Sequence, residues 1–226
     1  MNFLINKFFI IVSISFIIAI VVSCEKEESE YINDFCEQGH FYYTFEEKYY
    51  IDSLMQNDYL LIGFEKSFLD EQINEFLNNQ TYLESGNLIE LCDLRDYSYK
   101  LIIRRFKTSK SCTEIEKIIQ KLHNSEIVAF AAYTYEGKFC IGWDCTELMS
   151  YSNEFLVKLN DSTDLIKLNN LVTKTNTWIE KDSGSFIVIG VDKNSLGNSM
   201  QMANYFYETG LFYYAHPNFR YFDLYY

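Results

Sequence analysis

The hydrophobic pattern of residues 153–226 constrains the fold more than any other feature of the chain. The segment opens with NEFLVKL, whose alternation is typical of a half-buried strand, and residues 162–176 then carry leucines at helical spacing. A hairpin signal, a helical segment from Ser195 and a last strand before Pro217 follow. With right-handed crossovers, this strand-helix-strand-strand-helix-strand order predicts a four-stranded antiparallel sheet covered on one face by two helices, the ferredoxin-like arrangement.

Two residues mark expected helix ends in this segment. Ser162 is suited to the N-cap of the first helix, and Gly210 is suited to end the second because glycine adopts the left-handed conformation.

The same order of elements recurs in residues 57–136, where the helices are expected to bury one apolar face each. The expected elements are the strand DYLLIGFE, a helix through Phe68, Leu69, Ile73, Phe76 and Leu77, the strands NLIELCD and YSYKLIIRRFK, a helix through Ile115, Ile118, Ile119 and Leu122, and the strand EIVAFAAYTYE. We therefore expect an α+β protein of two tandem ferredoxin-like βαββαβ units, 40–150 and 151–226. An extra strand pair at 40–51 precedes them, and GKFCIGWDC joins them.

The first 24 residues have the pattern of a bacterial lipoprotein signal. Lys7 precedes the apolar run Phe8 to Val22, which is shorter than the roughly 20 residues that a membrane-spanning helix needs. The run ends in Val-Val-Ser-Cys24, the pattern at which lipoprotein signal peptidase cleaves before a lipidated cysteine. We expect removal of residues 1–23 and a membrane anchor of two or three acyl chains at Cys24, since one chain binds only marginally. The alternative is an uncleaved signal anchor with an incidental cysteine.

Acidic residues follow this cysteine directly. The sequence Glu25-Lys26-Glu27-Glu28 resembles the tag that routes some Gram-negative lipoproteins to the outer face of the outer membrane. It favours an outer-membrane lipoprotein that is exposed at the cell surface. Residues 24–39 are expected to form an acidic, flexible tether.

The charge of the chain excludes two classes of partner. Without residues 1–23, which contain one lysine, 18 basic and 32 acidic side chains remain, a net charge of −14. Nucleic acids and anionic lipid head groups both require a basic surface. We therefore expect no nucleic-acid partner, and contact with the membrane only through the lipid.

The cysteines beyond the lipidation site are odd in number: Cys36, Cys92, Cys112, Cys140 and Cys145. Export permits disulfides, but sequence spacing does not assign the pairs. Cys140 and Cys145 would face opposite sides of one continuous strand, so a bridge between them needs a turn, which Gly142 could supply. Free or structurally paired cysteines are favoured, and a zinc site is the alternative, because paired short spacings are absent and the three histidines are scattered. We expect no metal and no cofactor.

No nucleophile motif accompanies the three histidines, His40, His123 and His216. Ser109, Ser111 and Cys112 share one loop but match no known catalytic pattern. The sequence therefore predicts a protein that is not an enzyme.

Residues 198–219 read NSMQMANYFYETGLFYYAHPNF. This stretch resembles the end of the N-terminal propeptide of secreted subtilisin-like serine proteases, where a helix containing ANxFYETGLF leads into a strand ending in A-x-PNF. The segments NEFLVKL and TKTNTWI are similar to the opening strand and the first helix exit of that propeptide. The likeness covers 151–226, about a third of the chain. The upstream part resembles, more loosely, an extra prodomain found in some of these enzymes.

The resemblance implies a compact domain that docks its sheet on a protease and leaves a C-terminal tail in the substrate cleft. It implies that His216, Pro217, Asn218 and Phe219 approach the tail and that residues 220–226 form it, so that Arg220 and Tyr221 also contact the protease. The catalytic domain of the family has no counterpart in this sequence. The implied function is a protease-binding or inhibitory lipoprotein. The alternative is a non-inhibitory envelope interaction or assembly lipoprotein that reuses the propeptide fold.

Overall fold

The computed structural model of the chain describes residues 35–44, 47–86, 98–141 and 144–222, and within 138–147 it describes the backbone alone. The predicted lipidation site Cys24, most of its tether and the predicted strand NLIELCD lie outside these residues. Residues 34–226 form one compact unit. In the described part, no helix is both long and apolar enough to span a membrane.

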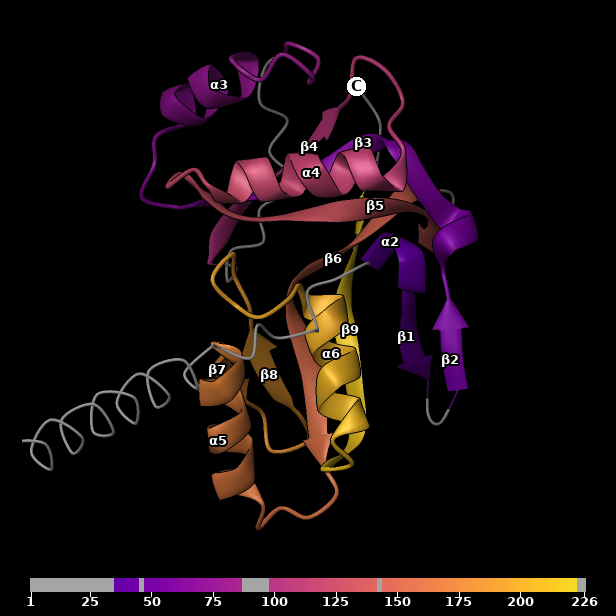
Figure 1. Cartoon of the computed structure of the whole chain (residues 1–226), viewed down its shortest axis with the longest axis vertical. Helices are drawn as coiled ribbons and strands as arrows, with labels where there is room; N and C mark the ends of the chain where they lie inside the picture. Colours follow the sequence, from indigo (N-terminus) through magenta and orange to yellow (C-terminus); the bar gives the residue numbers. More distant parts are fainter. Residues whose placement is uncertain (1–34, 45–46, 87–97, 142–143, 223–226) are drawn as a thin grey trace, which may run out of the picture. The chain divides into compact units, whose positions relative to one another are not determined.

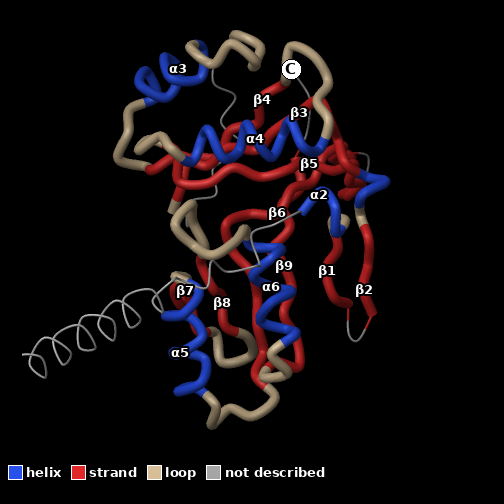
Figure 2. The backbone as a smooth tube through the Cα atoms, viewed as in Figure 1, coloured by secondary structure: helices blue, strands red, loops and turns tan. Residues whose placement is uncertain are grey.

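The protein is of mixed α+β class, with a large antiparallel sheet (Figures 1 and 2). The sheet strands are β3 (Met55–Glu65), β4 (Tyr99–Arg105), β5 (Val128–Ile141), β6 (Asp144–Leu159), β7 (Trp178–Asp182), β8 (Ile187–Gly190) and β9 (Phe212–Phe222). The described α-helices are α2 (Phe35–Gln38), α3 (Asp70–Asn78), α4 (Cys112–His123), α5 (Leu165–Thr175) and α6 (Ser199–Glu208). A separate hairpin consists of β1 (Phe41–Thr44) and β2 (Glu47–Tyr50), as predicted for 40–51.

Strand β6 connects the two halves of the sheet. It pairs with β5 through residues 144–150 and with β8 through residues 154–157, while β9 pairs along it from Leu148 to Leu159. The predicted connector GKFCIGWDC is thus part of a long β5–β6 hairpin, in which Cys140 lies opposite Cys145 in register. The predicted boundary between residues 150 and 151 falls inside β6.

The pairing within each half follows a similar order. In the second half the strands lie in the order β9, β6, β8, β7, and every neighbouring pair is antiparallel. In the first half β3 lies between β4 and β5. Helix α6 packs on β6 and β9, α5 contacts β7, and α4 packs on β5 (Figure 1).

The last strand is longer than the sequence predicted. The prediction ended it before Pro217, but β9 continues to Phe222, and Pro217 pairs with Phe155 of β6. In the described residues β9 pairs with β6 alone. A proline is tolerated in such an edge strand because an N–H directed away from the neighbour makes no ladder hydrogen bond.

Two predicted helix starts were wrong. Ser162 does not cap α5, because Asp161 accepts a hydrogen bond from Thr163 N at 2.8 Å and the helix begins only at Leu165. Helix α6 begins after Asn198 and not at Ser195.

The start of α6 has a clear cause. Asn198 Oδ1 accepts from Gln201 N at 3.0 Å, and Gln201 Oε1 accepts from Asn198 N at 3.0 Å, which is a capping box. The hydroxyl of Ser195 instead donates to Asn176 O at 2.8 Å. The predicted helix end was confirmed, since Gly210 follows α6 with φ of 73°.

Two leucines predicted on buried helix faces are exposed. Leu69 is 64% exposed at the residue before α3, and Leu165 is 47% exposed at the start of α5. Ile73 and Leu77 of α3 and Leu168 of α5 are buried as predicted.

A hydrophobic core lies in the first half and takes in a few residues of the second. It contains apolar side chains from β3, β4, β5, α3 and α4, and it also takes in Tyr151 of β6, Met200 of α6 and Phe222 of β9. The end of β9 is therefore part of the core of the first half.

Candidate partner-binding surface

The six residues that the resemblance assigned to partner binding all lie in β9. Tyr221 is 43% exposed, Pro217 is buried, and the other four are partly exposed. Arg220 pairs with Ser150 of β6, and Tyr221 pairs with Met149. Up to Phe222, which is 6% exposed, the segment is thus a paired strand and not the free tail that the sequence predicted. The predicted tail residues beyond it lie outside the described residues.

Two of these six residues are engaged with one carboxylate. Asn218 Nδ2 donates to Glu154 Oε2 at 2.9 Å, and Arg220 forms an ion pair with the same oxygen at 3.4 Å. Both contacts connect β9 with β6. They hold this part of the segment in the sheet. The two side chains therefore have little hydrogen-bonding capacity to offer to a partner.

The other members contact the β1–β2 hairpin. The ring of Tyr42 lies 4.7 Å from that of His216 and 5.2 Å from that of Phe219, both edge-on. Tyr42 also contacts Tyr49, its cross-strand partner, at 5.4 Å. The ring of Tyr214 is parallel to that of His216 at 5.6 Å.

These contacts join β9 and the hairpin into one surface, which we call the aromatic surface: Tyr42, Tyr49, Tyr214, His216, Phe219 and Tyr221. Tyr49 is 50% exposed and Tyr221 43% exposed, so both offer rings to solvent. Tyrosine and phenylalanine are enriched in protein–protein interfaces because they bury much area at a small cost in conformational entropy.

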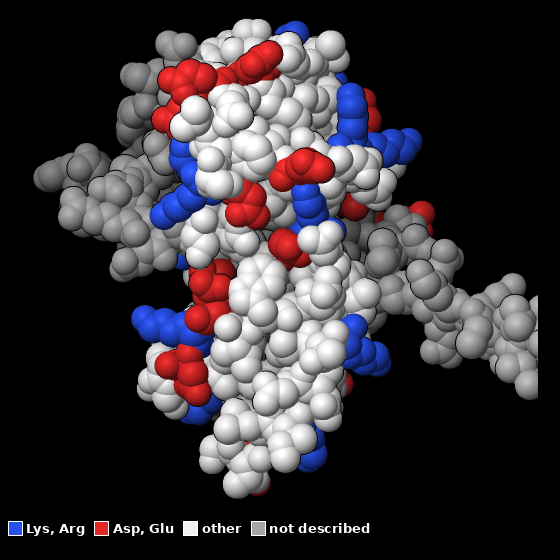
Figure 3. Space-filling model, turned by 90° about the vertical axis from the view of Figure 1, so that its left-hand side faces the viewer, with Lys and Arg blue, Asp and Glu red and all other residues white. Residues whose placement is uncertain are grey.

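The electrostatics of the aromatic surface favour neutral groups. Burial lowers the pKa of His216, whose Nδ1 donates to Pro217 O at 2.7 Å. Burial also raises the pKa of Tyr42, with smaller contributions from the phenols of Tyr49, Tyr221 and Tyr214. At neutral pH the surface therefore presents uncharged rings. Figure 3 shows a different side of the molecule, which lies to the left in Figure 1 and away from the hairpin; there Lys and Arg side chains are scattered among Asp and Glu.

The hairpin is fixed to α6. Asn204 Nδ2 donates to Phe41 O at 2.8 Å, and Tyr43 Oη donates to Glu208 Oε1 at 2.7 Å. The ring of Tyr43 also stacks on that of Tyr207, 4.4 Å away. The sequence predicted the hairpin but not its docking, because its alternating tyrosines do not reveal which element they face.

A second constellation surrounds a disulfide that the sequence left unassigned. Cys36 of α2 is bonded to Cys112, the first residue of α4. His40 Nε2 lies 3.4 Å from the sulfur of Cys112, and its Nδ1 shares a 2.8 Å hydrogen bond with Tyr135 Oη. Burial lowers the pKa of His40 to about 4, partly offset by Asp52. Residues 35–39, predicted as the end of the tether, are thus part of the fold.

This constellation has the residue types of a metal site. Ligand atoms of Cys36, His40 and Cys112 lie within 4.8 Å of one another. The two sulfurs are bonded to each other, however, and a metal would need them as separate thiolates. In this state the site is a structural disulfide.

The remaining catalytic candidates have structural roles. His123 Nε2 accepts from Ala131 N at 3.2 Å, and burial lowers its pKa to about 4. Ser111 caps α4 and accepts from Glu114 N at 3.4 Å.

Comparison with known proteins adds no relative. No family model matches the chain, and no curated protein matches it significantly.

Proposed function

We propose that this chain is a lipid-anchored, non-catalytic protein-binding module of the bacterial envelope. In this proposal it reuses a propeptide-like unit to bind a partner protein through the aromatic surface and does not fill a protease cleft. The observation that carries the proposal is the fixed position of β9. Because residues 220–222 pair with β6 and Phe222 is buried, this segment is not available as a product-like tail.

The strand order supports the ferredoxin-like part of the proposal. Numbered within the second half, β9, β6, β8 and β7 follow the order 4-1-3-2, with α5 and α6 as the two crossovers. This is the order that a βαββαβ unit adopts in the ferredoxin-like fold. In the first half, β4, β3 and β5 match positions 3, 1 and 4 of the same order. The predicted second strand of that half lies outside the described residues.

The hairpin supports the choice of surface. β1 contacts both α6 and β9 without pairing with β9, so it lies over that side of the sheet. Covering a sheet edge limits uncontrolled strand addition, and it leaves side chains as the main contact for a partner. Exposed tyrosines of both elements then form the contact area.

The anchor completes the proposed function. A lipid at Cys24 would connect to α2 through residues 25–34, which reach at most about 35 Å when extended. The disulfide of Cys36 then attaches the tether to α4. Replacing Cys24 with Ala should release the protein from outer-membrane fractions; retention of that variant would contradict the anchor.

The partner surface can be tested by site-specific photo-crosslinking in the native bacterium. A photoreactive phenylalanine analogue replaces Tyr49 or Tyr221 in the full chain, and Ile166, which is 75% exposed on α5, serves as the control position. We expect the same cross-linked species from Tyr49 and Tyr221 and none from Ile166. Cross-links of equal yield at all three positions, or none at the two tyrosines, would contradict the proposal.

Protease binding is the second candidate, because the strand order of the second half suits a propeptide docking its open sheet face. Its test is incubation of the full chain with secreted subtilisin-like proteases of the same bacterium. Inhibition that persists in a Tyr49→Ala variant would favour this candidate. Neither inhibition nor complex formation with any of these proteases would reject it.

A further inference from the structure

The disulfide between Cys36 and Cys112 has a histidine beside it at the spacing of a metal site. His40 Nε2 lies 3.4 Å from the sulfur of Cys112, and the ligand atoms of all three residues lie within 4.8 Å of one another. A tetrahedral zinc ion, with bonds of about 2.0–2.1 Å to nitrogen and about 2.3 Å to sulfur, holds these two kinds of atom about 3.5 Å apart. The imidazole therefore already lies at the distance from this sulfur that a shared zinc ion would impose.

The position of the imidazole does not depend on the disulfide. Its other ring nitrogen, Nδ1, shares a 2.8 Å hydrogen bond with Tyr135 Oη, and the backbone N of His40 donates to Asp52 Oδ1 at 2.6 Å. The ring also stacks on that of Phe35, 3.9 Å away. Histidines that bind metals generally make such a hydrogen bond through the second ring nitrogen, which fixes the orientation of the ring. His40 is therefore expected to keep its place when the disulfide is broken.

The two cysteines are also positioned by contacts other than their bond. Cys112 is the first residue of α4, whose N-terminus is closed by a capping box. Cys36 follows Phe35, which is 8% exposed and whose ring lies 5.4 Å from that of Tyr133. The Cα atoms of the two cysteines are 5.8 Å apart. Rotation of the side chains is then enough to bring the reduced sulfurs to the separation of about 3.8 Å that a tetrahedral zinc ion sets.

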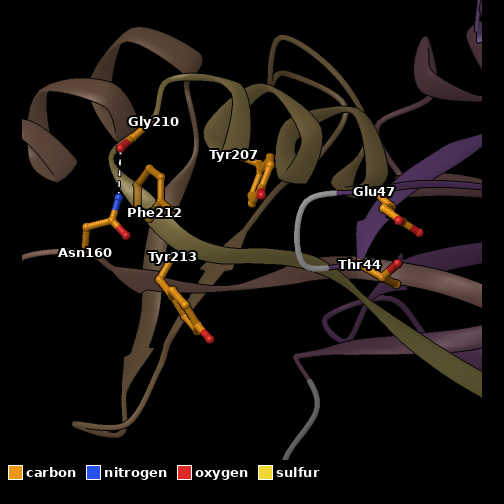
Figure 4. Close-up of a pocket in the computed structure, with 7 residues that line it drawn as sticks. All are labelled: Thr44, Glu47, Asn160, Tyr207, Gly210, Phe212 and Tyr213. Carbon is orange, nitrogen blue, oxygen red and sulfur yellow. Dashed lines mark hydrogen bonds between the residues drawn. The ribbon is translucent and has the colours of Figure 1, made fainter.

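The donor atoms favour zinc. Two thiolates and one imidazole are typical zinc ligands, and the two thiolates balance the charge of Zn²⁺. Cys36 and Cys112 are both partly exposed, so the site is not sealed from solvent. The hollow drawn in Figure 4 has no comparable set, because its described lining contains no cysteine or histidine and Glu47 is its one charged residue.

We propose that this site exchanges its disulfide for a zinc ion when it is reduced. A dithiol reductant transfers two electrons and two protons to the Cys36–Cys112 bond and becomes a disulfide itself, which leaves two thiols. Zn²⁺ then binds both sulfurs and His40 Nε2, displaces the two thiol protons and keeps a fourth position for water. An incoming disulfide oxidises the two thiolates, is itself reduced to two thiolates, and releases the ion.

The exchange keeps α2 attached to α4 in both states, through the disulfide or through the metal. It adds a redox-dependent metal site to the proposed protein-binding function. The two proposals can fail independently, because none of the three ligands belongs to the aromatic surface.

The test is a titration of the full chain with Co²⁺, a spectroscopic substitute for Zn²⁺. The protein is reduced with a water-soluble phosphine, which takes up the oxygen of a water molecule, and the reagent is removed in the absence of air. We expect one Co²⁺ per chain, with the charge-transfer absorption of thiolate ligands and the visible bands of tetrahedral coordination. Zn²⁺ should displace it, and the oxidised chain should show neither absorption.

Variants locate the ion, and all are compared in the reduced state so that none has the stability of the disulfide. His40→Gln and Cys112→Ser should each weaken Co²⁺ binding about tenfold or more. Tyr135→Phe removes only the hydrogen bond to His40 Nδ1 and should weaken binding about 10–100-fold. The matched control is the double variant Cys140→Ser/Cys145→Ser, which also removes two cysteines and should bind Co²⁺ as the unchanged chain does.

Glu47→Gln is the control for binding by surface carboxylates, and it should leave the titration unchanged. The result for the reduced, unsubstituted chain decides the proposal even if a variant does not fold, which circular dichroism would show. Three outcomes would overturn the proposal: no thiolate-bound Co²⁺ in the reduced chain, the same binding by the oxidised chain, or equal loss in Cys112→Ser and in the Cys140→Ser/Cys145→Ser control.

Discussion

Cys36 and Cys112, 76 residues apart in sequence, are joined by a disulfide that attaches α2 to the first residue of α4. Everything between them, including the hairpin, β3, α3 and β4, belongs to one covalent loop. Closing a loop of this length restricts the unfolded chain strongly. The bridge should therefore contribute to stability well beyond the contacts of α2 itself.

Cys112→Ser should lower the free energy of unfolding by about 2–4 kcal/mol. Urea denaturation followed by circular dichroism measures the effect. The control is a double-mutant cycle, because Cys36→Ser and the double variant should each cost about as much as Cys112→Ser alone. Additive losses in the double variant would show that the two sulfurs act separately.

Two buried histidines should make the protein less stable in mild acid. Burial lowers the pKa of His40 and of His123 to about 4 in the folded protein, against 6.5 for an unperturbed group. Unfolding therefore takes up protons between these values, so the stability is complete above pH 6.5 and is lost as the pH falls toward 4. Each histidine contributes a slope of up to about 1.4 kcal/mol per pH unit in this window.

The measurement is urea denaturation at half-unit steps from pH 7.5 to 5.0. His123→Gln, which keeps a hydrogen-bond acceptor for Ala131 N, should remove about half of the histidine slope. An unchanged slope in this variant would contradict the assignment. His216 is the control position, since its pKa is lowered to a smaller extent.

The end of β9 should behave as core. Phe222 is 6% exposed and packs with residues of the first half, so Phe222→Ala should cost about 3 kcal/mol through the cavity that it leaves. Tyr221→Ala, one residue away and 43% exposed, should cost less than about 1 kcal/mol. Thermal and urea denaturation of both variants provide the comparison. A neutral Phe222→Ala would mean that the segment detaches in solution.

The docking of the hairpin depends on a buried amide. Asn204 is 5% exposed and donates to Phe41 O, so Asn204→Ala should leave that carbonyl without its partner and cost about 1–3 kcal/mol. Hydrogen exchange should accelerate at the amides of β1 and β2. The amides of β7 and β8 are the internal reference, and equal acceleration there would indicate global destabilisation instead.

The sequence predicted the elements better than their connections. The alternation in NEFLVKL and the turn at Ser183-Gly184 identified β6 and the β7–β8 hairpin because these signals are local. The sequence predicts a strand end at Pro217, because a proline has no N–H for a ladder hydrogen bond, but the strand is broken only if a neighbouring strand needs that N–H. That depends on which edge of β9 is occupied, which one sequence does not reveal.

The aromatic surface was predicted only in part, because its contacts join residues that are far apart in the sequence. His216 and Phe219 were identified through the propeptide resemblance, but Tyr42, which contacts both, lies more than 170 residues earlier. The pairing of Cys36 with Cys112, 76 residues apart, is also long-range. Contacts of this kind arise from topology and leave no mark in local spacing.

The sharing of β6 between both halves has a consequence for how this protein can be divided. A chain cut at the predicted boundary would separate Leu148, Met149 and Ser150 of β6 from their partners Phe222, Tyr221 and Arg220 in β9, and both fragments would expose unpaired N–H and C=O groups. Such edges recruit other strands and promote aggregation. The sequence divides into two halves with the same order of elements, but neither half is expected to be soluble as a separate fragment. A soluble protein therefore requires both halves in one chain.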